Sequence, residues 1–211
     1  MTAKDMFSHR VSILTGHYGT GKTEVSVNLA LALAAEGEQV MLADLDIVNP
    51  YFRSRERRPL LEKAGVRVIS SSQACSDADV PALPAELLTI LENREIRGIL
   101  DIGGDPVGAR VLARFQPKIV QEDYQLIFVL NANRPEVRDA ESAAAYLRSI
   151  EAVTGLTCSG LVNNTHLCGE TTPAEIRKGA ALAQEVSRQT GIPILCHTAE
   201  RRFLESLSDL G

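Results

Sequence analysis

A glycine-rich stretch of eight residues, Gly16-His17-Tyr18-Gly19-Thr20-Gly21-Lys22-Thr23, constrains the fold of this chain more than any other feature of its sequence. It lies between an apolar run, 11–15, and a stretch with helical spacing of apolar residues, 22–35. Glycines allow tight turns and let backbone N–H groups approach an anion, and the following helix adds the positive end of its dipole. The pattern G-x-x-x-x-G-K-[ST] therefore predicts a P-loop, which holds the phosphates of a nucleotide.

The last two residues of this loop carry the chemistry of the motif. Lys22 is placed to reach the β- and γ-phosphates as a point charge, and the Thr23 hydroxyl is placed to bind magnesium. Fixed residues at four positions, between a strand and a helix, make a chance match rare. The sequence therefore predicts a nucleotide and Mg²⁺ as ligands, with ATP favoured and GTP left open.

Short apolar runs alternate with longer stretches of helical spacing along the rest of the chain. Strands are expected at 11–15, 40–43, 66–70, 98–102, 126–130, 159–163 and 194–196. Helices are expected at 22–35, 85–93, 140–153, 173–190 (with Thr172 as its cap) and 201–210, with a short one that Pro59 interrupts. This alternation predicts an α/β fold, a doubly wound and mostly parallel sheet of about seven strands, in a single nucleotide-binding domain over residues 1–211.

Acidic residues end two of the expected strands. Asp44 and Asp46 follow the second strand, and Asp101 ends an apolar run in the fourth, as a Walker B acid does. Ligands bind outside the carboxyl ends of parallel strands, so we expect Asp101 and Asp46 to act on magnesium and the phosphates. Asp44 stays open between that role and an ordinary helix cap. The adjoining Gly103 and Gly104 are expected to bring a backbone N–H to the γ-phosphate and to move when it leaves.

Composition narrows the class of protein and of partner. The chain has 211 residues and a formal net charge of −5, which argues against a general nucleic-acid binder. Its four cysteines lie far apart with no C-x-x-C pair, so they predict neither a disulfide scaffold nor a zinc or iron–sulfur framework from one chain. The first ten residues lack an apolar signal core, and no apolar stretch approaches the length of a membrane span. We therefore expect a cytoplasmic protein.

Taken together, these motifs resemble the MinD/ParA/CobB-type P-loop ATPases of the SIMIBI class, which include the nitrogenase iron protein. The resemblance covers most of the chain and rests on Gly16 to Thr23, Asn28-Leu29-Ala30, Asp44-Leu45-Asp46 with Asn49-Pro50, and Asp101-Ile102-Gly103-Gly104. It implies catalytic roles for Lys22, Asp46 and Asp101, and magnesium ligation by Thr23, Asp46 and Asp101. It implies a nucleotide site made by Gly16, His17, Tyr18, Gly19, Thr20, Gly21, Lys22, Thr23, Glu24, Gly103, Gly104, Asn163 and Asn164, where Asn163 or Asn164 reads the adenine.

Two residues depart from the family pattern. Many members carry a lysine after the first glycine that reaches the partner's phosphates across a homodimer, and this chain has His17 there. A histidine is mostly neutral at pH 7, so His17 is expected to serve either as a weaker, pH-sensitive substitute or as a loop residue without a phosphate contact. Glu24 stands where a hydroxyl residue is usual, and phosphate repulsion predicts that its side chain turns away.

The resemblance implies a slow ATPase that acts as a molecular switch on an unidentified protein client, in its maturation or positioning. Two alternatives stay open. One is a ligase or kinase that activates a small molecule with ATP. The other is a nucleotide-dependent binding module with negligible turnover.

Three other features bear on partners and metals. The basic run at 53–58 is interpreted as a solvated helix face, with contact to a partner or anionic substrate as the alternative. Cys75 is interpreted as an ordinary loop cysteine, with metal bridging between two copies as the alternative, and His166 with Cys168 cannot complete a metal site alone. The stretch 201–210 predicts a packed helix rather than a membrane anchor.

Overall fold

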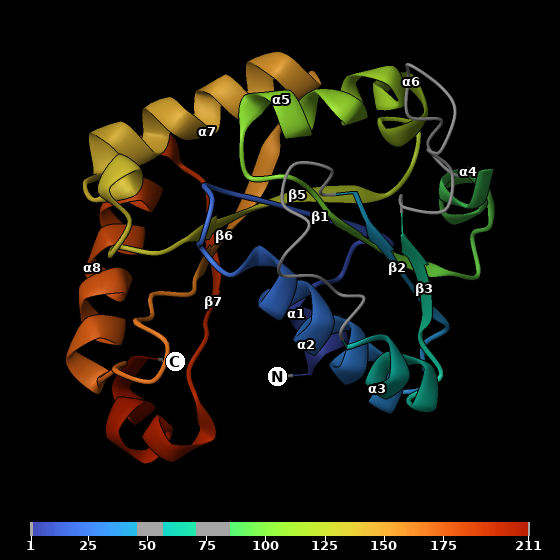
Figure 1. The fold of residues 1–211 in the computed structure, drawn as a ribbon. Helices are drawn as coiled ribbons and strands as arrows, with labels where there is room; N and C mark the ends of the chain where they lie inside the picture. Colours follow the sequence, from blue (N-terminus) through green and yellow to red (C-terminus); the bar gives the residue numbers. More distant parts are fainter. Residues whose placement is uncertain (1, 46–56, 71–84, 211) are drawn as a thin grey trace.

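The computed structural model describes residues 2–45, 57–70 and 85–210 of the chain. Within them, seven parallel strands form one sheet in the order β3-β2-β4-β1-β5-β6-β7 (Figure 1). The strands are β1 (Val11–Thr15), β2 (Val40–Asp44), β3 (Arg67–Ser70), β4 (Arg97–Asp101), β5 (Tyr124–Leu130), β6 (Cys158–Asn163) and β7 (Ile194–His197). The predicted doubly wound α/β fold is confirmed, and every pairing in the sheet is parallel.

Helices cover both faces of this sheet (Figure 1). On one face lie α1 (Ala3–Met6), α2 (Lys22–Ala35) and α3 (Arg58–Lys63), whose apolar side chains share a core with the strands. On the other lie α4 (Ala85–Glu92), α5 (Pro106–Ala109), α6 (Gln116–Ile119), α7 (Ala140–Thr154) and α8 (Pro173–Thr190). Short 3₁₀ helices are η2 (Arg110–Arg114), η3 (Pro135–Val137), η4 (Arg201–Phe203) and η5 (Glu205–Leu210).

Because helices cover both faces of the sheet, its strands are buried on both sides, and this explains their apolar sequences. Every residue of β1 and β2 is buried, as are all but the first residue of β5. A strand buried on both faces needs a nearly continuous apolar run rather than alternation, which is the pattern that marked these strands in the sequence. Observed and predicted bounds of the strands and of the four long helices agree within two residues.

The predictions were wrong for three segments that lack a continuous apolar stripe. Residues 201–210 form η4 and η5 instead of one packed helix, and within them Leu207 is buried whereas Leu204 is 58% exposed. Pro59 lies in the first turn of α3 and so helps to begin that helix, where its missing N–H costs nothing. Between 106 and 119 lie α5, η2 and α6, which the sequence did not predict.

Among the described residues, no helix is both long enough and apolar enough to cross a membrane.

Candidate nucleotide site

The glycine-rich loop joins the carboxyl end of β1 to the start of α2, at the place where the strand order reverses between β4 and β5. Two glycines fix its path. Gly16 has φ +141°, and a Cβ there would lie 2.4 Å from the Val129 carbonyl oxygen of β5. Gly21 has φ +82° and caps the start of α2. Because side chains rarely adopt these angles, the loop needs glycine at both positions.

The end of the loop places Lys22 and Thr23 in the first turn of α2. Lys22 is buried, and its Nζ donates to the His17 carbonyl oxygen at 3.3 Å. The Thr20 hydroxyl donates to the same oxygen at 2.9 Å. The lysine therefore folds back over the loop, with its charge beside the N-terminus of α2, where the helix dipole also favours an anion.

Two of the predicted acids face the same side of the sheet as α2. Asp44 and Asp101 are buried register partners at the ends of β2 and β4. Side chains alternate along a strand, and Leu100 belongs to the core on the α7 side whereas Ile99 belongs to the core on the α2 side. Asp101, and Asp44 beside it, therefore point to the α2 side. The structure brings both carboxylates to the face from which the P-loop helix starts.

The segment after β4 packs directly on the loop. Gly104 is buried, and a Cβ there would lie 2.7 Å from Lys22 Nζ and 2.8 Å from the Tyr18 backbone N. Gly103, also buried, lies against Gly108 of α5, because a Cβ at Gly108 would be 3.0 Å from its Cα. The structure thus places Gly104 beside the groups that the motif uses for phosphates.

Side chains from the other half of the sheet hold the loop by its carbonyl groups. Arg134 Nε donates to the Gly19 carbonyl oxygen at 2.8 Å, and Asn164 Nδ2 donates to the Thr20 carbonyl oxygen at 2.7 Å. Thr198 Oγ1 donates to Asn164 Oδ1 at 2.5 Å. Sequence reasoning missed Arg134 and Thr198. The available signal was their position just after β5 and β7, at the same edge of the sheet as the loop.

Asn163 and Asn164 have different surroundings. Asn163 is fully buried, and its Nδ2 donates to the Ile176 carbonyl oxygen at 3.1 Å while its Oδ1 accepts from the Thr165 N–H at 3.1 Å. Its amide therefore ties β6 to α8. Asn164 is half-buried beside the loop, so adenine reading stays a prediction that fits Asn164 better than Asn163.

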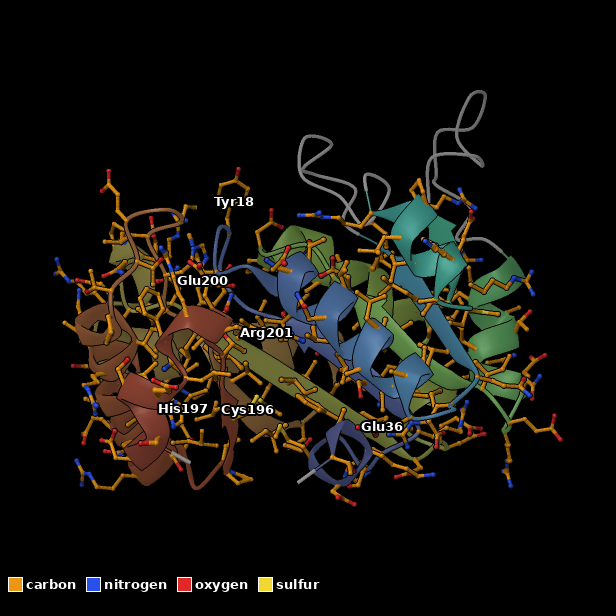
Figure 2. All side chains as sticks on the ribbon, turned by 90° about the horizontal axis from the view of Figure 1, so that it is seen from below. Tyr18, Glu36, Cys196, His197, Glu200 and Arg201 are labelled. Atoms are coloured by element: carbon orange, nitrogen blue, oxygen red, sulfur yellow. The ribbon has the colours of Figure 1, made fainter. Side chains whose placement is uncertain are left out.

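The remaining loop residues point in several directions. His17 stacks edge-on against Tyr146 of α7, with ring centroids 5.1 Å apart, and its Nδ1 lies 3.6 Å from the Glu136 carboxylate. Tyr18 is 58% exposed at the tip of the loop and projects outward (Figure 2). Glu24 is exposed, and its carboxylate accepts from Asn28 Nδ2 at 3.0 Å, one turn along α2.

Several sequence hypotheses fall on residues outside the described ranges, namely those on Asp46, Asn49-Pro50, Arg53, Arg55 and Cys75. Of the basic run, Arg58 pairs with Glu62 at 2.8 Å on the surface of α3. Cys168 Sγ lies 3.8 Å from His166 Nδ1. Within the described ranges, no group of three or more His, Cys, Asp or Glu residues could hold a metal ion.

Comparison with known proteins agrees with the loop and the fold. A family model described as "ParA: NUBPL iron-transfer P-loop NTPase" matches residues 6–55. A cytosolic Fe-S cluster assembly factor, cfd1, from Emericella nidulans is 36% identical over 95 residues, which are 45% of this chain and 26% of that protein. An iron-sulfur cluster carrier protein from Escherichia coli is 50% identical over 40 residues, 19% of this chain and 11% of that one. The matches thus span about a quarter or less of these curated relatives.

Two solved structures are similar over nearly the whole chain. The signal recognition particle 54 kDa protein from Aeropyrum pernix, in complex with GDP, has a TM-score of 0.58 at 24% identity, covering 95% of this chain and 47% of that one. A nucleotide-binding protein from Archaeoglobus fulgidus, in complex with ADP, has a TM-score of 0.52 at 20% identity, covering 99% and 88%. Identities this low show the fold alone.

Proposed function

We propose that this chain, whose loop and fold resemble those of SIMIBI-class P-loop NTPases of the ParA and MinD type, binds ATP with magnesium and hydrolyses it slowly to ADP and phosphate. The observation that carries this proposal is the convergence of Lys22, the start of α2 and the Gly104 segment at one end of the loop. Hydrolysis in this site depends on positioning and charge neutralisation rather than on covalent chemistry. Lys22 and the inward N–H groups of the loop hold the phosphates.

The residues present fit a magnesium ion. Mg²⁺ prefers oxygen ligands, and the face on which α2 starts offers the Thr23 hydroxyl and the Asp101 carboxylate. Asp44, which points to the same face, is a further candidate. When bound, the ion offsets the negative charge that develops on the phosphates. Asp46 is proposed to orient the attacking water, from its place two residues after Asp44.

The proposed ATPase would act as a molecular switch on a protein client. A homodimer closed across the nucleotide remains a prediction. The contacts of His17 bear on it, because the imidazole would have to leave Glu136 and Tyr146 before it could reach a partner's phosphates.

Iron–sulfur cluster delivery is a second candidate function, with the cluster as cargo. It is favoured by the description of the family model that matches residues 6–55 and by the names of the two relatives. The described cysteines belong to no group of three or more His, Cys, Asp or Glu residues that could hold a metal ion, and Cys158 is buried, Cys168 exposed and Cys196 half-buried. Cluster binding would therefore need Cys75, a second copy of the chain or a partner.

Nucleotide titration and phosphate release test the main proposal. Lys22→Ala is expected to weaken MgATP binding or abolish turnover with the fold intact by circular dichroism. Asp46→Ala is expected to bind MgATP normally and release phosphate more slowly. Normal turnover in both variants would refute the assignment of the site.

The second candidate has its own measurement. Anaerobic reconstitution with iron and sulfide, followed by analysis of both elements and an absorption spectrum, is expected to give a bound cluster that Cys75→Ala loses. The buried Cys158 supplies the matched control, as Cys158→Ala. A protein that binds MgATP but retains no iron and sulfide would exclude cluster carriage and leave the ATPase proposal standing.

A further inference from the structure

Gly104 closes the end of the loop at which Lys22 lies. A Cβ at this position would be 2.7 Å from Lys22 Nζ, 2.8 Å from the Tyr18 backbone N and 3.0 Å from the Gly16 carbonyl oxygen. The loop amides of a P-loop cradle the α- and β-phosphates, and its lysine reaches the β- and γ-phosphates. A methyl group does not fit between Gly104 and these atoms, and a phosphoryl group is larger. The Lys22 side chain can shift, whereas Tyr18 N and Gly16 O belong to the backbone of the loop, so a γ-phosphate held between this loop and Gly104 would displace Gly104.

One side chain holds Gly104 in this place. The Tyr146 hydroxyl, on α7, donates a short hydrogen bond to the Gly104 carbonyl oxygen. Its ring packs on Phe128 of β5, with centroids 6.3 Å apart, and edge-on against His17 of the loop. Burial, with smaller contributions from Asp105 and Glu136, raises the pKa of Tyr146 to about 12, so the hydroxyl stays a donor at neutral pH.

We propose that Tyr146 determines how strongly the site discriminates between nucleoside diphosphate and triphosphate. The hydrogen bond to Gly104 stabilises the arrangement in which the segment after β4 lies on Lys22. A diphosphate has no γ-phosphate to displace that segment, whereas the γ-phosphate of a triphosphate must break or stretch the bond. Tyr146 thus favours the diphosphate and acts as a positioning residue through Gly104. This inference rests on the proposed nucleotide binding.

A substitution can separate the contribution of the Tyr146 hydroxyl from that of its ring. Tyr146→Phe keeps the packing on His17 and Phe128 and removes only the bond to Gly104. A matched control is Tyr124→Phe, at the start of β5, where the hydroxyl lies 3.5 Å from the Thr157 N–H and far from the loop in the sheet. Both variants lose one tyrosine hydroxyl that contacts a backbone group.

Calorimetric titration with MgADP and with a magnesium complex of a non-hydrolysable ATP analogue tests the proposal. In Tyr146→Phe, the analogue is expected to bind roughly fivefold more tightly relative to ADP than in the parent protein, the factor given by one net neutral hydrogen bond. Tyr124→Phe is expected to keep the parent ratio. An unchanged ratio in Tyr146→Phe, a shift toward ADP, or an equal shift in both variants would overturn the proposal.

Hydrogen exchange in the parent protein gives a readout that depends on no variant. The analogue, but not ADP, is expected to change amide exchange over residues 101–109. Equal exchange with both nucleotides would count against the role of Tyr146. If the parent protein bound neither nucleotide, the proposed function would fail. If it bound both, and Tyr146→Phe left the ratio of analogue affinity to ADP affinity unchanged, only the inference about Tyr146 would fail.

Discussion

The link between Asn164, Thr20 and Thr198 offers a quantitative test of how the loop is held. The carbonyl of Thr20 and the N–H of Gly21 belong to one planar trans peptide group, so they point in opposite directions. Asn164 Nδ2 holds that carbonyl at 2.7 Å. The bond therefore turns the Gly21 N–H toward the opposite side of the loop. Asn164→Ala removes this constraint, and Thr198→Ala removes the support behind it together with a longer contact, 3.3 Å, from the Thr198 hydroxyl to the Asn163 carbonyl oxygen.

The expected magnitudes follow from the bonds lost. Asn164 makes two of them, to Thr20 and to Thr198, and a net hydrogen bond contributes about 1 kcal/mol. Asn164→Ala should therefore lower the free energy of unfolding by about 2 kcal/mol, and Thr198→Ala by about 1 kcal/mol. Because both variants lose the same bond, the double variant should cost little more than Asn164→Ala alone, a coupling of about 1 kcal/mol.

Urea unfolding of the four proteins, with MgADP titration of each, measures both consequences. Asn164→Ala should also weaken ADP binding, because the hydrogen bond that fixes the direction of the Gly21 N–H is lost. Thr198→Ala should weaken ADP binding less. Strictly additive unfolding energies would show that Asn164 and Thr198 do not act together. Unchanged ADP affinity in Asn164→Ala would refute the argument from the peptide plane.

Two further predictions concern titrating groups. Burial raises the pKa of Cys158 to about 12 and that of Cys196 to about 11, so iodoacetamide at pH 8 should label the exposed Cys168 before Cys158 and Cys196, as measured by peptide mass spectrometry. Equal labelling of Cys158 and Cys168 would contradict this. Burial lowers the pKa of both His166 and His197 below 6.5. The unfolded chain then binds more protons than the folded one as pH falls through about 6.5, so stability should decrease, and His166→Gln should flatten that slope in thermal unfolding between pH 7.5 and 5.5.

The sequence was most informative where a single physical demand dictates residue type. A strand buried on both faces must be apolar throughout, so the bounds of β1 and β5 were predictable. Long helices with one apolar stripe, such as α7 and α8, were predictable for the same reason. Residues 106–119 make three short helical turns whose limits depend on tertiary contacts, and no local pattern encodes them.

Some residues of the candidate site were likewise predictable from the sequence, and others were not. Glycines such as Gly16 and Gly21 are needed for backbone reasons that a motif records. Arg134 acts through a bond to a carbonyl more than a hundred residues earlier. Its position after β5 is a sign that it lies near the loop, but no motif records the bond itself. Asn163 shows that a motif can also match a residue with another role. It stands at a strand end, as in the family pattern, but its side-chain amide makes hydrogen bonds to the Ile176 carbonyl oxygen and the Thr165 N–H inside the protein.

The strand order gives these contacts a common explanation. Because β1 lies where the order reverses, its loop meets β4 on one side and β5 on the other. The β4 side supplies Asp101, at the end of the strand, and the Gly104 segment, which approaches Lys22 and the backbone N of Tyr18. The β5 side supplies Arg134, which binds a carbonyl group of the loop. The half of the sheet that starts with β5 thus holds the loop by its carbonyl groups, while the half that starts with β4 lies at the end of the loop where we propose that the phosphates bind.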